Sequence, residues 1–460
     1  MIPLSLALLA AATGAALDQI PDPDAVVTGA LCFDSRDVAP GGLFACLSGK
    51  NTDGHDHAEQ AIASGAVAVL ATRPVGVPAL IVPDVLAAMA AIATTVSDAF
   101  TGSVIALTGS AGKTTTKDLL AAVLAADGPT VATQRSFNNE VGFPVTVSRV
   151  EPGTTYLLLE MGARGAGHIT QLCEVARPTI ATVLNVGSAH VGEFGTREAI
   201  AAAKAEIVQA LPADGIAVLN ADDPLVAAMA HHTGATVVTF GTGEGCDVRG
   251  SQVVLDDQGR PRLTLHHHGE SATVQLQVHG WHNAINALAA AATALAAGVP
   301  LSTIITALSA AEITSGDRMQ VTTRPDGITL INDTFNASPE AVLAALTALG
   351  DIGGDQRRQI AVLGEMAELG DQAAAWHATV AEAIATSRIH HTILIGDEHA
   401  KAMLTTLQIR GVSVEHADPA APLAERVNKV LRPGDVVLIK GANALGLSTV
   451  ARQLAAMTTA

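Results

Sequence analysis

Thr108-Gly109-Ser110-Ala111-Gly112-Lys113-Thr114-Thr115-Thr116 is the most informative segment of this chain. It follows an apolar run, residues 104–107, and continues into a helix-like run, residues 117–124. A strand, a glycine-rich turn and a helix N-terminus form a cradle for anions, because backbone N–H groups and the helix dipole point at the same spot. Lys113 can reach the β and γ oxygens of a nucleotide, and the Thr114 hydroxyl can bind Mg²⁺. The segment therefore predicts a nucleoside triphosphate site.

The phosphate loop has the short G-x-x-G-K-T-T form. The longer form carries a glycine five residues before its Gly-Lys pair, and Leu107 stands at that position here. Glycine and threonine are also common in plain turns, but turn chemistry explains poorly a lysine after glycine at a strand-to-helix switch. The predicted nucleotide-binding residues are Thr108, Gly109, Ser110, Ala111, Gly112, Lys113, Thr114 and Thr115.

The composition of 460 residues fits a large acidic protein with about two to four domains. Apolar residues make up 49% of the chain and aromatic residues 2%, so alanine, valine, leucine and isoleucine must fill the cores. The formal charge of −18 argues against a nucleic-acid-binding surface, which needs a basic patch. We therefore expect small-molecule substrates, held by local lysine, arginine, Mg²⁺ and backbone amides, and no nucleic-acid partner.

The cysteines and the N-terminus both favour a cytoplasmic protein. Cys32, Cys46, Cys173 and Cys246 lack the spacing of a zinc site or a disulfide framework, which fits a reducing compartment. Residues 2–17 are apolar but lack the positive charges that begin a signal peptide, so we expect an amphipathic first helix. No apolar run elsewhere has membrane-spanning length without glycine, proline or charge, so we expect no membrane insertion.

The pattern of apolar runs divides the chain into three α/β units. We expect an N-terminal domain over residues 1–100, a central domain over 101–315 and a smaller C-terminal domain over 316–460. Strands and helices alternate in the central unit, which predicts a mostly parallel, doubly wound sheet. Its expected strands are 103–107, 154–160, 179–185, 215–220 and 235–240, and its expected helices are 113–126, 196–211 and 222–232.

Two further segments and the third unit complete the expected fold. Residues 247–278 alternate polar and apolar side chains and predict an antiparallel addition to the central domain. Within it, His266-His267-His268 is read as an exposed strand end rather than a metal site. An alanine-rich helix follows over 282–297. The C-terminal unit has expected strands at 328–332, 359–363, 392–395 and 435–439.

Polar side chains follow the expected strands where an open α/β sheet binds its ligands. Glu160 ends the strand 154–160, where it can hold Mg²⁺ or cap the next helix. His190 follows the next strand, and a lone histidine is usually structural. Lys204 lies in an alanine-rich helix, where lysine is usually solvated, so its position alone gives it no function.

Loops and a domain boundary supply more candidates. Asn138 and Asn139 can form an ordinary turn or, as substrate-binding residues, orient a carbonyl or phosphate. Residues 331–340 place acid and amide groups at a strand end. Arg318 lies where the second and third units join, and it can reach a γ-phosphate or form a surface salt bridge. Both interpretations of Arg318 stay open.

Taken together, these segments resemble the Mur ligase family over essentially the whole chain. The short phosphate loop marks the superfamily, and residues 138–144, 331–339 and 362–370 resemble the branch that adds D-alanyl-D-alanine. The Asp-Asn-Pro-Arg motif of the branch that adds diaminopimelate or lysine is not found. The other segments that carry the resemblance are Asp34-Ser35-Arg36, Asp53-Gly54-His55, Glu160-Met161-Gly162, Ser188-Ala189-His190, Ala203-Lys204-Ala205-Glu206, His282-Asn283-Ala284-Ile285-Asn286 and Arg318.

The resemblance implies a domain for the UDP end of a precursor, a domain for ATP, and a Rossmann-like domain that brings the incoming dipeptide. It implies an ATP-dependent amide ligase that adds D-alanyl-D-alanine to UDP-N-acetylmuramoyl-tripeptide through an acyl phosphate. The product would be the pentapeptide precursor of peptidoglycan. We expect the protein to act as a monomer.

The resemblance also implies roles for single residues, and its catalytic set is Lys113, Glu160, His190, Lys204 and Arg318. The implied metal ligands are Thr114 and Glu160 for one Mg²⁺, and His190 and a carbamylated Lys204 for a second. The implied ATP contacts are Lys113 and Arg318 at the phosphates, Asn283 at adenine and Asp333 at ribose. The implied substrate contacts are Asn336 and Ser338 at the dipeptide, and Ser35, Arg36 and His55 at the nucleotide-sugar.

Two positions depart from the family pattern. Residues 440–443 read Lys-Gly-Ala-Asn where the family usually has Lys-Gly-Ser-Arg, so Asn443 cannot make the contact of that arginine with phosphate or carboxylate. Phe335 stands where tyrosine is common, which removes one hydroxyl.

Two alternatives remain beside this interpretation. One is another amide ligase of the superfamily, amino-acid-adding or folate-extending; the N-terminal unit at 30–71 argues against the folate type, which starts close to the phosphate loop. The other is a non-catalytic ATP-binding relative. The joint presence of Lys113, Glu160, His190 and Lys204 weighs against it.

Overall fold

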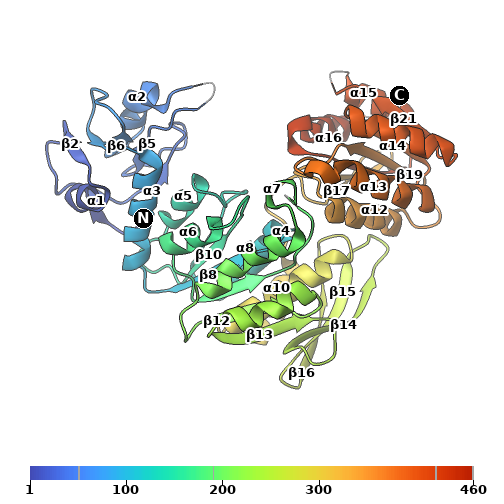
Figure 1. Cartoon of the computed structure of the whole chain (residues 1–460), viewed down its shortest axis with the longest axis horizontal. Helices are drawn as coiled ribbons and strands as arrows, with labels where there is room; N and C mark the ends of the chain where they lie inside the picture. Colours follow the sequence, from blue (N-terminus) through green and yellow to red (C-terminus); the bar gives the residue numbers. More distant parts are fainter. Residues whose placement is uncertain (50–51, 190, 420–421, 458–460) are drawn as a thin grey trace.

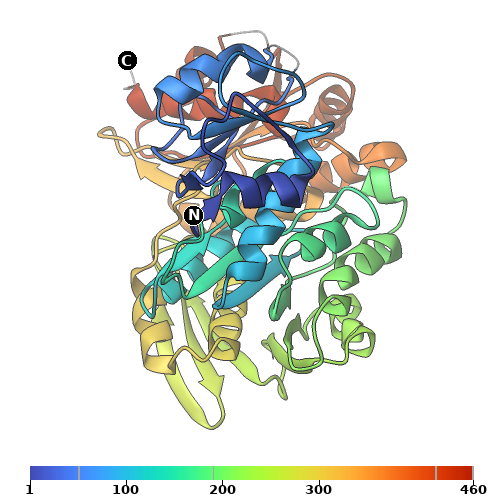
Figure 2. The same cartoon turned by 90° about the vertical axis from the view of Figure 1, so that its left-hand side faces the viewer.

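Three α/β domains form the molecule, as expected. The computed structural model describes residues 1–49, 52–189, 191–419 and 422–457. The N-terminal and C-terminal domains stand on either side of a central domain, on which both rest (Figure 1). Figure 2 shows the same arrangement from the side, with the N-terminal domain in front.

The N-terminal domain is built on a five-stranded sheet in the order β2-β7-β6-β5-β4, in which only β2 runs antiparallel. A small β1–β3 pair lies beside it. The elements are β1 (Leu4–Ser5), α1 (Leu6–Thr13), β2 (Ala16–Asp18), β3 (Val26–Val27), β4 (Leu31–Cys32), β5 (Leu43–Ala45), η1 (Gly54–His57), α2 (Ala58–Ala63), β6 (Ala68–Ala71), β7 (Ala79–Ile81) and α3 (Val85–Ala99).

The first helix is shorter than the expected 2–17, and it is not amphipathic. The Ser5 side chain accepts a hydrogen bond from the Leu8 N–H at its start, and Gly14 in the left-handed conformation, with φ 66°, ends it. Leucines lie on both sides of the helix, since Leu9 is buried while Leu8 is 46% exposed. The apolar run therefore spreads over a strand, a helix and a second strand.

The central domain carries a nine-stranded sheet in the order β16-β15-β14-β13-β12-β11-β8-β10-β9. The strands β8 to β14 pair in parallel, and β15 pairs antiparallel with both β14 and β16. The strands are β8 (Ser103–Thr108), β9 (Thr130–Ala132), β10 (Tyr156–Glu160), β11 (Ile180–Val183), β12 (Ile216–Asn220), β13 (Thr236–Gly241), β14 (Val248–Leu255), β15 (Pro261–His267) and β16 (Glu270–Gln275). The helices are α4 (Lys113–Ala125), α5 (Gly142–Val147), α6 (His168–Val175), α7 (Val191–Phe194), α8 (Arg197–Gln209), α9 (Pro224–Ala227), η2 (Ala228–His232), α10 (His282–Ala296) and α11 (Leu301–Ala310).

The predicted alternation of strands and helices is confirmed in this domain, with two corrections. The expected helix 222–232 is a short α9 followed by the 3₁₀ turn η2. The antiparallel segment is part of the main sheet, because β14 pairs in parallel with β13. β14, β15 and β16 extend away from the other two domains (Figure 1). β15 ends at His267, and His268 is exposed at the following turn.

The alanine-rich helix α10 packs against α4 and against the strands β11 to β15. Ala287 and residues 289–292 are completely or almost completely buried there. Small side chains let α10 lie close to the helix that follows the phosphate loop, and close packing fixes their relative positions. A Cβ on Gly112 would lie 2.4 Å from Asn286 Oδ1, so this contact admits only glycine.

The C-terminal domain has a six-stranded sheet in the order β17-β18-β22-β19-β20-β21, parallel except for β17. This agrees with the expected strands. The elements are β17 (Gln320–Thr323), β18 (Thr329–Asp333), α12 (Pro339–Gly353), β19 (Gln359–Gly364), η3 (Gly370–Gln372), α13 (Ala373–Thr386), β20 (His391–Ile395), α14 (Glu398–Ile409), β21 (Val414–Ala417), α15 (Leu423–Val430), β22 (Val436–Lys440), η4 (Asn443–Leu445) and α16 (Leu447–Ala456). Across the described ranges, every helix is too short or too polar to cross a membrane.

The four cysteines are free thiols, and the structure predicts which of them react. Burial raises the pKa of Cys32, Cys46 and Cys173 to about 12. At pH 8 only ~1 in 10⁴ of each such thiol is then the reactive thiolate. Burial also raises the pKa of Cys246, but this residue is only half-buried, so a reagent has access to its sulfur. We expect a thiol reagent such as DTNB at pH 8 to modify Cys246 alone in the folded protein and all four cysteines in denaturant. Rapid modification of any thiol in the folded Cys246→Ser variant would contradict this.

Candidate active site

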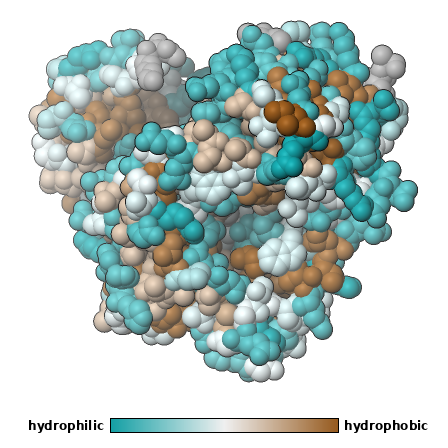
Figure 3. Space-filling model, turned by 45° about the vertical axis from the view of Figure 1, so that its right-hand side comes forward, coloured by the Kyte–Doolittle hydropathy of each residue, from teal (hydrophilic) through white to brown (hydrophobic). Residues whose placement is uncertain are grey.

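A cavity of about 1910 Å³ lies where the three domains meet. Its wall includes Asp84 and Ala87 of the N-terminal domain, the phosphate loop of the central domain, and Asp333 and Glu340 of the C-terminal domain. The space-filling view shows the surface hollowed between the domains (Figure 3). A ligand in this cavity can touch all three domains at once.

The phosphate loop lies at the carboxyl end of β8, the third strand from the β9 edge of the central sheet, and Ser110 to Thr115 line the cavity. Asn185 holds the loop in shape: its Oδ1 accepts hydrogen bonds from the N–H groups of Ser110 at 3.0 Å and Ala111 at 2.9 Å. Those two amides are therefore occupied. The N–H groups in the first turn of α4 have no intrahelical partner, so they are the ones available to an anion.

Two of the predicted loop residues shape the site rather than line it. The Thr108 hydroxyl is completely buried and donates to the Met161 carbonyl at 2.9 Å. The Gly109 carbonyl accepts a hydrogen bond from Lys113 Nζ at 2.8 Å. Burial lowers the pKa of Lys113, and Glu160 partly opposes that shift while Arg318 adds to it. The hydrogen bond to the Gly109 carbonyl holds the Lys113 amine at the cavity wall.

Glu160 ends β10, next to the phosphate-loop strand, and is 1% exposed. Its Oε2 accepts a hydrogen bond from the Thr114 hydroxyl at 2.8 Å, and its Oε1 accepts one from Asn138 Nδ2 at 2.7 Å. These contacts decide against the helix-capping interpretation of Glu160. Asn139 stabilises a turn, since its Oδ1 accepts a hydrogen bond from the Gly142 N–H. It also lines the cavity.

Lys204 lies on the cavity wall and is only 7% exposed, although lysine in an alanine-rich helix is usually solvated. Burial lowers its pKa well below the ordinary value, and the nearby Lys113 lowers it further. Both effects favour the neutral amine, which is the nucleophilic form of a lysine side chain. His190, the other implied ligand of the second metal, lies outside the described residues.

Arg318 lies on the cavity wall, and it forms no salt bridge with any carboxylate of the described residues, which was the alternative interpretation. Its guanidinium lies over the Phe335 ring, with 3.9 Å between the guanidinium carbon and the ring centre. Its Nη2 donates to the Ser136 hydroxyl at 3.1 Å, and within the described residues its Nε is buried without a partner. Burial lowers its pKa, while Glu160 and other carboxylates raise it. The guanidinium therefore still has capacity for an anion.

The remaining predicted C-terminal residues lie together at the carboxyl end of β18. Asp333 Oδ2 accepts from Lys440 Nζ at 2.5 Å, and Lys440 also donates to the Asn336 carbonyl at 2.9 Å. Asn336 and Ser338 line the cavity, as does Asn443, which replaces the family's arginine. This edge of the C-terminal domain therefore presents acid, amide and amine groups to the cavity.

The structure does not place Asn283 on the cavity wall. It is 2% exposed, and its amide donates to the His279 carbonyl at 2.7 Å and accepts from Asn286. Its neighbours Trp281 and Ile285 line the cavity instead. Asn283 holds the start of α10 in place.

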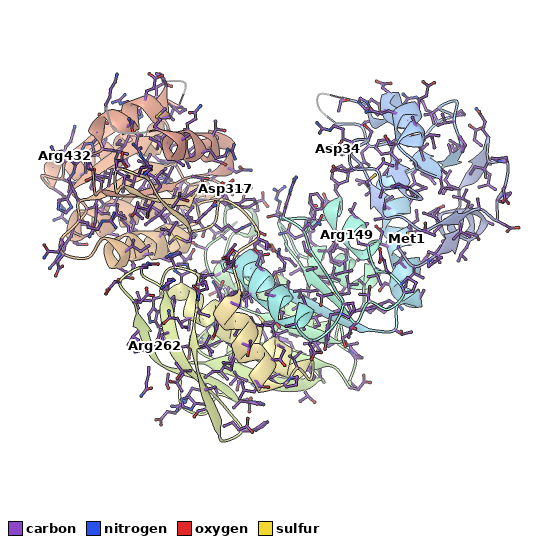
Figure 4. All side chains as sticks on the ribbon, turned by 180° about the vertical axis from the view of Figure 1, so that it is seen from behind. Met1, Asp34, Arg149, Arg262, Asp317 and Arg432 are labelled. Atoms are coloured by element: carbon purple, nitrogen blue, oxygen red, sulfur yellow. The ribbon has the colours of Figure 1, made fainter. Side chains whose placement is uncertain are left out.

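The predicted N-terminal residues also lie off the cavity wall. Both ring nitrogens of His55 are used, by Asp53 at 2.6 Å and by the N–H and hydroxyl of Thr72 at 3.1 Å. Ser35 is buried and donates to Gln60, and Arg36 is paired with Asp34 on the surface. Asp34 faces the gap between the two outer domains (Figure 4). Of the three, Arg36 has the side chain most open to a ligand.

Sequence reasoning missed several residues of the site. Asn185 lies two residues beyond the end of β11, and a polar residue just after a strand was the available signal. Glu340 links two domains: its Oε1 accepts from the Ser188 N–H at 2.7 Å, and its Oε2 is buried without a partner in the described part of the chain. Both tryptophans of the chain, Trp281 and Trp376, line the cavity. Nothing in the sequence signals this shared location.

Comparison with known proteins gives a consistent result. Three family models match in order: "Mur ligase family, catalytic domain" over residues 29–98, "Mur ligase middle domain" over 107–294, and "Mur ligase, glutamate ligase domain" over 317–443. The UDP-N-acetylmuramoyl-tripeptide–D-alanyl-D-alanine ligase of Mycobacterium tuberculosis is 46% identical, over 99% of this chain and 98% of that protein.

Solved structures agree. The crystal structure of MurF from Acinetobacter baumannii has a TM-score of 0.86 at 29% identity and covers 99% of both chains. The MurF ligase from Thermotoga maritima in complex with ADP has a TM-score of 0.79 at 28% identity, over 94% of this chain and 98% of that one.

Proposed function

The chain belongs to the Mur ligase family, and on that premise we propose how its cavity joins D-alanyl-D-alanine to UDP-N-acetylmuramoyl-tripeptide. The chain is the ATP-dependent ligase of peptidoglycan synthesis that performs this addition. The observation that carries the assignment is 46% identity, over nearly all of both chains, to a ligase of that name. The cavity between three domains suits a reaction with three substrates.

The reaction needs an activated carboxyl group. A carboxylate cannot expel oxide, so the tripeptide carboxylate attacks the γ-phosphate of ATP and forms an acyl phosphate and ADP. The D-alanyl-D-alanine amine then attacks the acyl carbon, the tetrahedral intermediate collapses, and phosphate leaves. Two anions must approach each other in the first step, so cations must surround them.

In the proposed ATP site, Lys113 and the first-turn amides of α4 hold the phosphates. Lys113 already lies at the cavity wall, and the Ser110 hydroxyl is buried there without a partner in the described residues. Arg318 meets the γ-phosphate from the C-terminal side, and its unpartnered Nε supports that role. Asp333 receives the ribose. Asn283 supports the adenine pocket by positioning the start of α10, where Ile285 and Trp281, the residue that precedes the helix, line the cavity.

The residues around Glu160 fit Mg²⁺. A buried carboxylate next to a threonine hydroxyl supplies the oxygen donors that this ion prefers, and no cationic side chain of the described residues is paired with that carboxylate. Thr114 and Glu160 would hold a first ion, and His190 with carbamylated Lys204 a second. Mg²⁺ supplies charge neutralisation at the phosphoryl oxygens. Asn138 fixes the orientation of the Glu160 carboxylate.

Carbamylation of Lys204 requires its neutral amine. Carbon dioxide reacts with an unprotonated amine, and burial lowers the pKa of Lys204 and so favours that form. The product is a carboxylate, which offers a metal ion oxygen ligands and a negative charge. Burial among alanines also protects the carbamate from bulk solvent.

We propose that Asn336 and Ser338 bind the dipeptide and that Asn139 contacts a substrate, since all three line the cavity. Arg36 faces the nucleotide-sugar, whereas Ser35 and His55 shape the loops around it through their own hydrogen bonds.

The proposed domain boundaries are 1–100, 101–315 and 316–460. We expect a cytoplasmic monomer whose product supports wall growth, cell shape and cell division.

The test is phosphate release by the purified protein. We expect release only with Mg-ATP, UDP-N-acetylmuramoyl-tripeptide and D-alanyl-D-alanine all present, and a pentapeptide product by mass spectrometry. Omitting each component in turn is the control. Release with another acceptor, such as a single amino acid or glutamate on a folate, would move the chain to another branch. No release with any combination would favour a non-catalytic ATP-binding relative.

A further inference from the structure

Residues 311–319 form the linker between the central and C-terminal domains. The half of this linker nearer the central domain is hydrogen-bonded to α4, the helix that follows the phosphate loop. Asp118 Oδ2 accepts a hydrogen bond from the Ser315 N–H at 2.8 Å, and Asp118 Oδ1 accepts one from the Ser315 hydroxyl at 3.2 Å. These bonds join residues that are 197 positions apart. Asp118 lies one helical turn beyond Thr114, so Ser315 is tied to the helix that begins at the ATP phosphates.

A buried ion pair supports this fastening. Lys117 forms an ion pair with Asp118, and its Nζ donates to the Ser315 hydroxyl at 3.3 Å. Both charged residues are 3% exposed. Burying two charges is costly unless they are paired and their remaining hydrogen-bonding groups are satisfied. Here the further partner is Ser315, so the pair is organised around the linker.

On its other side the linker is fastened to the C-terminal domain through Asp317. Asp317 Oδ1 accepts from Asn332 Nδ2 at 2.8 Å, and its Oδ2 accepts from the Ser448 hydroxyl at 2.7 Å. Its carbonyl accepts from the Phe335 N–H at 3.0 Å. Asp317 has a φ of 63°, a strained conformation for a residue with a side chain, which these contacts hold in place. Figure 4 shows Asp317 where the C-terminal domain meets the central domain.

Only Gly316 lies between these two fastened residues. It is exposed, and a Cβ built on it would have no neighbour within 4 Å. A residue without a side chain or contacts is the position in this linker that can change its dihedral angles freely. Arg318 follows two residues later, within about 8 Å of chain. A rotation at Gly316 therefore moves Arg318 relative to the phosphate loop.

We propose that Lys117 and Asp118 are positioning residues that fix the central side of a one-residue hinge at Gly316 and so place Arg318 against the γ-phosphate. The inference rests on the proposed role of Arg318. It couples the phosphate-loop helix directly to the arginine delivered by the C-terminal domain. Lys117 and Asp118 themselves touch no substrate in this mechanism.

The main test is the double variant Lys117→Met with Asp118→Leu, which removes both buried charges and the acceptor for Ser315. Replacing both charges by apolar groups is tolerated better than removing one. We expect kcat to fall about tenfold while the Kd for ADP changes less than about twofold, because Arg318 acts on the γ-phosphate that ADP lacks. Asp127→Asn, at the far end of α4, is the matched control: it weakens the contact with Tyr156 and should leave kcat unchanged.

A mutant cycle with Arg318→Lys separates positioning from stability. If Lys117 and Asp118 act through Arg318, the double variant should cost less than about twofold in kcat once Arg318 is already lysine. A structural role would give losses that multiply, and a Kd for ADP that rises with them. Either result would overturn the proposal.

A second variant leaves the buried pair intact. One extra glycine after Gly316 should loosen the hinge and lower kcat about as much as the double variant, whereas one after Gly411, in an exposed turn, should not. Unchanged kcat in the Gly316 insertion would also overturn the proposal. Failure of the proposed function is distinct, because the wild-type protein would then show no acceptor-dependent phosphate release.

Discussion

The Lys113→Met variant is expected to lose at least about 10³-fold in kcat/KM for ATP, because it removes a preorganised cation from the developing phosphoryl charge. Methionine keeps most of the volume of the side chain. It removes the ammonium, which donates to the Gly109 carbonyl and lies near Glu160 and Arg318. Phosphate release with all three substrates at varied ATP concentration measures the effect.

Lys429→Met, on the exposed surface of α15, is the matched control and should retain wild-type rates. The thermal stability of Lys113→Met should not fall, since burial of the charged lysine is itself unfavourable, as its lowered pKa indicates. A variant that folds and keeps kcat/KM within tenfold of wild type would exclude Lys113 from phosphate binding.

The phosphate loop shows what local sequence can predict. A strand, two glycines and a lysine at fixed spacing constrain backbone geometry over a few residues, so β8, the turn and α4 follow from the segment itself. The place of Glu160 follows as well, because carboxyl ends of parallel strands share one edge of the sheet. The structure confirms that β10 neighbours β8 and that Glu160 contacts Thr114.

Lys204 shows what periodicity cannot predict. In the alanine-rich α8 it reads like any solvated lysine, and only tertiary packing makes it 7% exposed and close to Lys113. The resemblance to a family, not the helix pattern, pointed to it. The hydrogen bonds between Ser315 and Asp118 could not be predicted from the sequence either, because no local pattern links residues so far apart in the chain.

Side-chain direction is a further limit, because a motif identifies a residue without saying where its side chain points. Asn283 and His55 were both expected to contact ligands, yet their polar atoms are engaged with His279, Asn286, Asp53 and Thr72. The secondary structure of residues 2–17 was ambiguous for a related reason. The apolar content of this segment fits a single helix as well as the short helix between two strands that the structure shows.

Lys204→Ala is expected to lose at least about 10³-fold in kcat, and added formate or acetate should restore part of the loss. The alanine leaves a space at the cavity wall where the carbamate carboxylate would lie, and a small carboxylate can occupy it. The wild-type protein should gain activity with added bicarbonate after carbon dioxide has been removed. Burial lowers the pKa of Lys204, and only the neutral amine reacts with carbon dioxide, so this recovery should slow as the pH falls and the amine becomes protonated.

Lys204→Arg is the control, because it keeps a long cationic side chain that cannot form a carbamate and leaves no space for an added carboxylate. It should be inactive, and formate or acetate should not rescue it. A purely structural role for Lys204 predicts the opposite pattern, in which arginine restores activity better than alanine with acetate does. Full activity of Lys204→Ala without any added carboxylate would remove Lys204 from the mechanism, and the second Mg²⁺ would then need another ligand.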